Sequence, residues 1–184
     1  DAPRIIFKNL AINGTDMYAQ AGSPLPSFCL ANQAAVILNN IRFDSMYYGV
    51  DVISSNDMSS IVNVKWRGGV GGGWLWYDRD YSGDGFYARG IFASQTGDMQ
   101  VIWLNRCYGG RIESCVDGVY RFDRCKAISL DSIHIEGSPA RIEINDSNVG
   151  ISNSYFHITK APGNPSPIKL NHIVGDVLQN YHVT

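Results

Sequence analysis

Residues 67–90 (RGGVGGGWLWYDRDYSGDGFYARG) combine a glycine-rich run with a dense group of aromatic and charged side chains. Flat aromatic rings suit the faces of sugar rings, while carboxylates and arginines can hydrogen-bond to sugar hydroxyls. We therefore predict that this segment is a long inserted loop that binds a saccharide. Its candidate substrate-binding residues are Trp74, Trp76, Tyr77, Arg79, Tyr81, Tyr87 and Arg89. The structural alternative is that Trp74 and Trp76, which are spaced as in a strand, fill a gap beneath the loop.

Asp78 and Asp80 are the carboxylates of this segment that are candidates for acid and base catalysis. The spacing of Asp78, Asp80 and Ser82, followed by Gly83, also matches the first half of a calcium-binding loop. The last position of such a loop should be a glutamate, and here it is Arg89. The sequence therefore predicts no metal site at this segment, and it predicts no cofactor.

A short repeat supplies a second set of candidate carboxylates. Residues 104–107 (LNRC) recur 18 positions later as 122–125 (FDRC). If this repeat is one turn of a stacked chain, Glu113 and Asp131 lie about 4.8 Å apart on adjacent rungs. That separation suits a retaining glycosidase (about 5–5.5 Å), and a two-rung separation suits an inverting one (about 6.5–9.5 Å). Mutual repulsion between the two carboxylates would raise one pKa and prepare a general acid.

Asp117 is a further catalytic candidate, since it lies near this pair of carboxylates in the repeat region. A structural role is the alternative for both aspartates. Asp131 falls where the inward alternation breaks and can bond to backbone amides at a corner, and Asp117 precedes a glycine, as in a turn.

Three histidines each lie between apolar residues, at His134, His157 and His182. In a strand the apolar neighbours point inward, so the three imidazoles are expected to form a ladder on one outer face. Parallel side chains converge poorly on a metal ion. A surface or subunit-interface ladder is the favoured interpretation.

The composition describes the elements that must position these residues. The chain has 184 residues, 45% of them hydrophobic, with 19 Ile and 21 aromatic residues against 9 Leu and 3 Glu. This composition is typical of β-strands and tight turns rather than of helices. A formal net charge of −2 gives no basic field for nucleic acid, and no apolar run is long enough to span a membrane. The four cysteines fit no metal or redox spacing and are expected to be buried free thiols.

Apolar strands that end on asparagine or aspartate recur along the chain at an irregular period of about 18–31 residues, with one gap of 42. The asparagines among these corner residues are Asn9, Asn40, Asn63, Asn105, Asn145 and Asn171. Such a period suits short strands that stack in parallel, each rung burying its inward side chains against its neighbours. Nine leucines are too few for leucine-rich repeats, and hairpin dipeptides are scarce. An immunoglobulin-like sandwich is the competing fold.

The rungs VILNNIRF, IEINDSNVGISNSYFHIT and IKLNHIVGDVLQNYHVT resemble the right-handed parallel β-helix of bacteriophage tailspikes and pectate-lyase-like polysaccharide-degrading enzymes. The resemblance lies in the Ile/Val-rich rungs and their asparagine corners outside residues 67–90, and it assigns no catalytic residue of the family to this chain. It implies an elongated, often trimeric protein that binds, and commonly cleaves, a cell-surface polysaccharide on its flank.

We therefore expect an all-β chain whose residues 1–184 form one single-stranded right-handed parallel β-helix (a solenoid), belonging to a larger spike. The expected function is that of a polysaccharide depolymerase, a glycosidase more than a lyase; a lyase would use Arg79 or Arg89 with a His or Tyr. A non-enzymatic adhesin and a purely structural shaft are the alternatives. The expected partners are a bacterial surface polysaccharide and two further copies in a homotrimer, in a virion tail or outside the cell.

Overall fold

The strands follow from the alternation of apolar and polar residues, which directs every second side chain to the interior. In the computed structural model the described residues are 3–14, 28–46, 48–54, 58–68, 73–81, 83–94, 100–136, 141–157, 168–171 and 181–183. These residues form seventeen strands and no helix. The predicted all-β class is therefore confirmed, and no helix of the described chain could span a membrane.

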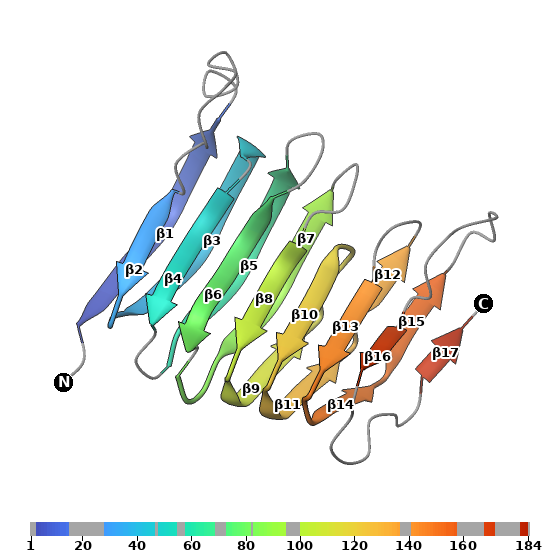
Figure 1. The fold of residues 1–184 in the computed structure, drawn as a ribbon. Helices are drawn as coiled ribbons and strands as arrows, with labels where there is room; N and C mark the ends of the chain where they lie inside the picture. The colour runs from blue at the N-terminus through green and yellow to red at the C-terminus, as the bar shows by residue number, and fades with distance from the viewer. Residues whose placement is uncertain are drawn as a thin grey trace.

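The strands belong to three sheets in which every pairing of strands is parallel (Figure 1). The first sheet contains, in order, β1 (Arg4–Asn13), β3 (Ala35–Met46), β5 (Ser60–Gly68), β7 (Tyr87–Ser94), β9 (Tyr108–Glu113), β11 (Lys126–Asp131) and β14 (Val149–Ser152). The second contains β2 (Cys29–Asn32), β4 (Tyr48–Ser54), β6 (Trp74–Tyr81), β8 (Gln100–Asn105), β10 (Val119–Asp123), β13 (Arg141–Asn145) and β16 (Ile168–Asn171). The third contains β12 (His134–Glu136), β15 (Ser154–His157) and β17 (Tyr181–Val183).

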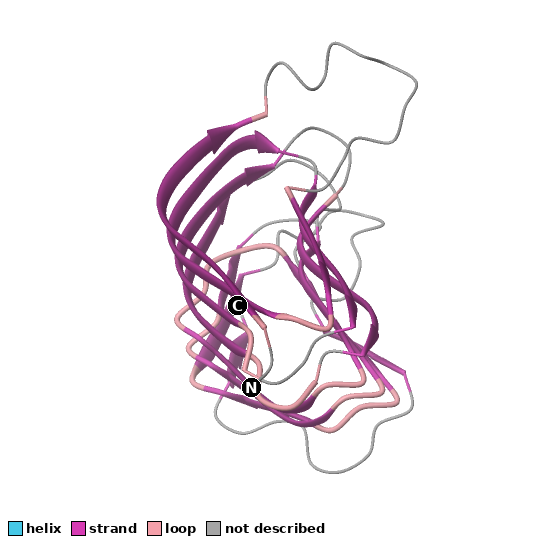
Figure 2. Cartoon of the chain, turned by 90° about the vertical axis from the view of Figure 1, so that its left-hand side faces the viewer, coloured by secondary structure: helices cyan, strands magenta, loops and turns pink. Residues whose placement is uncertain are grey.

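The chain alternates between sheets, so that consecutive strands lie in different sheets and each return adds the next neighbour in order. Viewed from the N-terminal end, the strands lie on opposite sides of the interior (Figure 2). This parallel arrangement is compatible with a solenoid. It excludes the antiparallel sandwich, and the predicted neighbours Asn105 and Asp123 are indeed paired in parallel.

The predicted insertion at residues 67–90 is wrong. Strand β5 extends to Gly68, β6 covers Trp74–Tyr81, and β7 begins at Tyr87. The physical reason is that the aromatic residues of this stretch favour a pleated strand. Residues 69–72 and Ser82 lie outside the described part.

The predicted asparagine corners separate into two rows. Asn9, Asn40 and Asn63 have φ of 57°, 56° and 53°, a left-handed conformation that asparagine tolerates better than most residues. They stack where the long strands of the first sheet bend, and Asn40 Nδ2 donates to Asn9 Oδ1 at 2.8 Å. Asn105 and Asn145 instead end strands of the second sheet, paired through Asp123.

One continuous core fills the interior. Its largest fully buried side chains include Trp66, Trp76, Tyr120 and Phe122. Aromatic contacts connect successive rungs, as between Phe43 and Trp66, whose ring centroids are 5.2 Å apart. All four cysteines are free and buried, as predicted. Burial raises the pKa of Cys115 to about 11 and that of Cys125 to about 12, so these thiols are unreactive.

Candidate functional site

The outer face of the second sheet carries a row of side chains from five adjacent strands. The register pairs Asp51 with Tyr77, and Tyr77 with Trp103. It then pairs Trp103 with Arg121, and Arg121 with Glu143. Because parallel pairing stacks equivalent positions about 4.8 Å apart, these residues follow one another along the stack. We call this set, together with Tyr48, Trp74, Arg79 and Asp123, the aromatic row.

The rings of the aromatic row form a continuous strip. Tyr48 lies 4.2 Å from Trp74 between ring centroids, and Trp74 lies 5.0 Å from Tyr77. Tyr77 in turn lies 4.3 Å from Trp103, whose other neighbour is the Arg121 guanidinium at 4.1 Å from the ring. All four rings are half-buried. Contacts between the rings fix their positions, and part of each ring faces solvent. A ligand that binds there would therefore cost little side-chain entropy.

The carboxylates of the aromatic row are each held by donors. Arg79 donates to both oxygens of Asp51, at 2.7 Å for the bond from Nε. Asp123 accepts from Trp103 Nε1 at 2.6 Å, from Arg121 Nε at 2.9 Å and from Asn145 Nδ2 at 2.6 Å. These bonds pre-organise the polar groups, which suits recognition of hydroxyls.

Glu143 is one of the two buried carboxylates of the aromatic row, at 9% exposure against 3% for Asp51. Its Oε2 lies 4.0 Å from Arg121 Nε, which links it to the same guanidinium that covers Trp103. Along the aromatic row the side chains therefore change from a carboxylate to rings, then to a guanidinium group and again to a carboxylate. Such a surface is amphipathic rather than strongly charged.

A second group of predicted residues lies on the first sheet, around Glu113. Its carboxylate accepts from Tyr87 Oη at 2.6 Å and from Arg111 Nη2 at 2.6 Å, and Arg89 Nε lies 3.7 Å away. The bond from Tyr87 and the two arginines lower the pKa of Glu113, while the bond to Glu113 raises the pKa of Tyr87. Glu113 is therefore an ionised carboxylate at neutral pH.

Asp131 pairs with Glu113 across adjacent strands, as the repeat predicts. The predicted repulsion that would raise one pKa is wrong, because each carboxylate has its own donors. Bonds from Asn153 and Ser152, at 2.8 and 2.9 Å, lower the pKa of Asp131. Neither carboxylate of this pair has a raised pKa, and the bonds of Asp131 match the corner role.

Asp117 lies in a third group, with His134 and Glu136. The Glu136 N–H donates to Asp117 Oδ1 at 2.7 Å, and His134 Nε2 lies 2.9 Å from Glu136 Oε1. Burial raises the pKa of Asp117, which also has a positive φ of 58°. Among Glu113, Asp117 and Asp131, Asp117 is the one whose pKa is raised.

The two aspartates should titrate in a fixed order. We expect Asp117 to titrate above the ordinary value of 3.8 and Asp131 below it. Because a raised pKa means tighter proton binding in the folded state, the stability due to Asp117 rises as the pH falls, whereas that due to Asp131 is lost below about pH 3.8. Carboxyl carbon chemical shifts followed by NMR from pH 2 to 7 measure both. The reverse order would contradict the described contacts.

The remaining predicted residues do not gather at one place. Trp76 and Asp78 are fully buried, and Trp76 Nε1 donates to Asp78 Oδ2 at 2.9 Å inside the core. Neither side chain is therefore available to a sugar at the surface, and the gap-filling alternative holds for Trp76. Asp80 is exposed at the end of β6, and the side chain of Tyr81 lies outside the described part.

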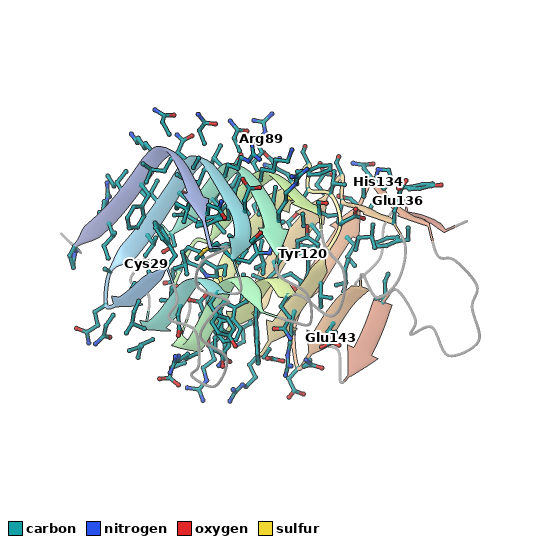
Figure 3. The ribbon with its side chains drawn as sticks, turned by 90° about the horizontal axis from the view of Figure 1, so that it is seen from above. Cys29, Arg89, Tyr120, His134, Glu136 and Glu143 are labelled. Atoms are coloured by element: carbon teal, nitrogen blue, oxygen red, sulfur yellow. The ribbon has the colours of Figure 1, made fainter. Side chains whose placement is uncertain are left out.

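The substrate-binding candidates that remain are divided between two faces. Trp74, Tyr77 and Arg79 belong to the aromatic row, whereas Tyr87 and Arg89 surround Glu113. Figure 3 shows Arg89 on the side opposite to Glu143, with His134 and Glu136 on the side of Arg89. Two separate surfaces replace the single predicted site.

Asp51, Trp103, Arg121, Asp123 and Glu143 are missed by the sequence reasoning. A signal for two of them was present, because Trp103 and Arg121 immediately precede the repeated motifs at 104–107 and 122–125. Equivalent positions in a repeat stack on one another, so the 18-residue repeat implies that Arg121 lies beside Trp103.

The predicted histidine ladder is wrong in its register. His134 pairs with Tyr155, and Tyr155 pairs with His182, while His157 pairs with Glu136. Ile135, Phe156 and Val183 share one register position, and this pairing places the second histidine two residues away from the first. Across the described residues no group of three His, Cys, Asp or Glu side chains could hold a metal ion.

No protein-family model matches the chain, and no curated protein and no solved structure is significantly similar to it. Its function is therefore inferred from the arrangement of its own side chains.

Proposed function

We propose that the chain is a right-handed single-stranded parallel β-helix of the tailspike kind, and that its aromatic row binds a bacterial surface polysaccharide. The alternation of the strands between two long parallel sheets supports the fold. The observation that carries the function is the strip of four adjoining rings that ends under Arg121, with carboxylates on either side.

A linear ligand suits this surface, because the recognition groups repeat along the stack at the spacing of strands rather than converging in a pocket. Partly exposed rings offer apolar area to the C–H groups of sugars, and Asp123 and the guanidinium groups of Arg79 and Arg121 offer fixed acceptors and donors to hydroxyls. Arg121 contributes to both kinds of contact, since it covers Trp103 and bonds to Asp123.

Hydrolysis is the second candidate function, and Asp117 favours it. A carboxyl with a raised pKa beside another carboxylate is the arrangement that glycosidases use for acid and base. His134 and Glu136 lie on the side opposite to Glu143 (Figure 3), so a sugar chain bound to the aromatic row is directed away from them. Binding without cleavage at the aromatic row, as in an adhesin, is accordingly the function proposed first. The homotrimer and the location in a virion tail or outside the cell stay predictions.

Replacing Trp103 by alanine is expected to weaken polysaccharide binding by about 1–3 kcal/mol, or roughly 5- to 150-fold in Kd. The substitution removes the ring that contacts both Tyr77 and Arg121 and leaves the core untouched. A panel of bacterial surface polysaccharides identifies the ligand, and calorimetry then measures its affinity.

Tyr108→Ala is the matched control, because Tyr108 is an aromatic side chain of the first sheet that is 40% exposed. Its affinity should equal that of the wild type. Equal losses in the two variants would refute the assignment to the aromatic row, and failure of every polysaccharide to bind would leave the structural shaft as the function. Shortened products that disappear in Asp117→Asn would establish hydrolysis.

A further inference from the structure

The outer side of the first sheet has a pocket where β1, β3 and β5 bend. Its volume is about 410 Å³, within the range of small-ligand sites. It is lined by Asn9, Leu10, Ala11, Asn40, Ile41, Arg42, Asn63 and Lys65. None of these residues belongs to the aromatic row or to the groups around Glu113 and Asp117.

Stacked amides form the polar part of this pocket. Asn9, Asn40 and Asn63 are exposed and occupy equivalent positions on adjacent strands. A carboxamide offers two donors and an acceptor oxygen, more than the bond from Asn40 to Asn9 uses. These asparagines have positive φ, which interrupts the regular alternation of the strand at the bend and directs their side chains outward. The pocket therefore presents repeated donors and acceptors to solvent.

The surroundings of the pocket are positively charged. Among the described residues, the exposed cations that follow the bend on these strands are Arg42, Lys65 and Arg67. One carboxylate accompanies them: Asp44 lies 2.6 Å from Arg42. A chain with a net charge of −2 thus concentrates positive charge around one pocket. Anions are attracted to this side of the molecule.

Lys65 is the more available of the two cations that line the pocket, since Arg42 forms an ion pair with Asp44. Within the described chain no carboxylate lies within salt-bridge distance of it. Its ammonium group lies 5.8 Å from the centre of the exposed Phe92 ring, which positions it at the pocket without neutralising it. An ammonium without a carboxylate partner can bind a charged oxygen without first breaking an ion pair.

We propose that this pocket binds an anionic sugar unit, one that carries a carboxylate, sulfate or phosphate group, with Lys65 contacting the charged oxygens. The stacked amides match the hydroxyls of the same unit, which a free inorganic ion lacks. They also favour a saccharide over nucleic acid, whose binding would draw on a basic field extending along a duplex. The pocket belongs to the first sheet, whereas the aromatic row belongs to the second, and so the two sites are separate.

The test uses dextran sulfate oligosaccharides, with uncharged dextran of equal length as reference. Wild-type protein should bind dextran sulfate more tightly than dextran, with an affinity that falls as salt rises. Lys65→Ala should weaken this binding about tenfold, the effect of losing one charge-assisted hydrogen bond. Lys65→Arg should retain most of it, because the positive charge stays at the pocket.

Lys126→Ala is the matched control, since Lys126 is an exposed lysine that lies over Tyr108 rather than at the pocket. It should change the affinity for dextran sulfate less than twofold. Equal losses in the two alanine variants, or no loss in Lys65→Ala, would overturn the proposal. Competition by inorganic sulfate at equal charge concentration would show that a free ion suffices, and tighter binding of duplex DNA that depends on Lys65 would show that the ligand is nucleic acid; either result overturns the saccharide assignment. Lys65-dependent binding of dextran sulfate would stand even if no polysaccharide of the panel bound to the aromatic row, which separates this result from a failure of the function proposed above.

Discussion

Trp76→Ala is expected to lower the free energy of unfolding by about 3–5 kcal/mol, the usual cost of removing a large buried aromatic side chain. Trp76 is fully buried, lies 5.2 Å from Phe86 between ring centroids, and bonds through Nε1 to the buried Asp78. The variant loses packing and also leaves a carboxylate without one of its donors. Urea unfolding followed by fluorescence measures the change.

Trp76→Phe separates the two contributions, because it keeps a ring in the core and removes the indole donor. We expect it to be intermediate in stability. Polysaccharide affinity per folded molecule should stay at the wild-type value in both variants, in contrast to Trp103→Ala. A loss of affinity in Trp76→Ala without a loss of stability would mean that Trp76 is at the surface and would contradict the described core.

Gly118→Ala is expected to destabilise the protein by about 2–4 kcal/mol. Gly118 has φ of 93°, which L-residues rarely adopt, and an added Cβ would overlap the side chain of Val101. The backbone and the steric penalties therefore add. Thermal unfolding at several urea concentrations measures the loss.

Gly109→Ala isolates the backbone penalty, since Gly109 has φ of 75° and an added Cβ there would meet nothing within 4 Å. Its cost should be about 1–2 kcal/mol. The double variant Gly118→Ala/Val101→Ala should recover less than the full loss, because it relieves the overlap but opens space in the core. Equal costs at Gly109 and Gly118 would show that Val101 is not in the described position.

The general architecture was predictable because it depends on features that a sequence displays directly. Alternating Ile and Val residues indicate strands, and the 18-residue repeat aligns Asn105 with Asp123 and Glu113 with Asp131, both as observed. The positive φ of Asn9, Asn40 and Asn63 explains why asparagine recurs at the bend. Short-range chemistry thus predicts the corners, and periodicity predicts which rungs are neighbours.

The site was less predictable because a cluster of aromatic and charged residues in the sequence does not form a cluster in space here. Alternation sends Tyr77 outward and the adjacent residues Trp76 and Asp78 inward, and the next strand carries Tyr87 and Arg89 to another sheet. The partners of Tyr77 and Arg79 come instead from β8 and β4. A register error of two residues, as at His157, leaves the alternation of apolar and polar residues unchanged, so the sequence pattern does not reveal it.

Each strand of the two long sheets pairs only with the strands before and after it in the same sheet. In the described chain, stability is therefore a one-dimensional sum of rung and nearest-neighbour terms, as in repeat proteins, rather than a property of one central nucleus. Adding or deleting a complete rung would change the contacts at that point of the stack and leave the contacts between the other rungs in place. The length of the aromatic row, and with it the number of sugar units it could contact, can thus change by whole rungs without a new fold.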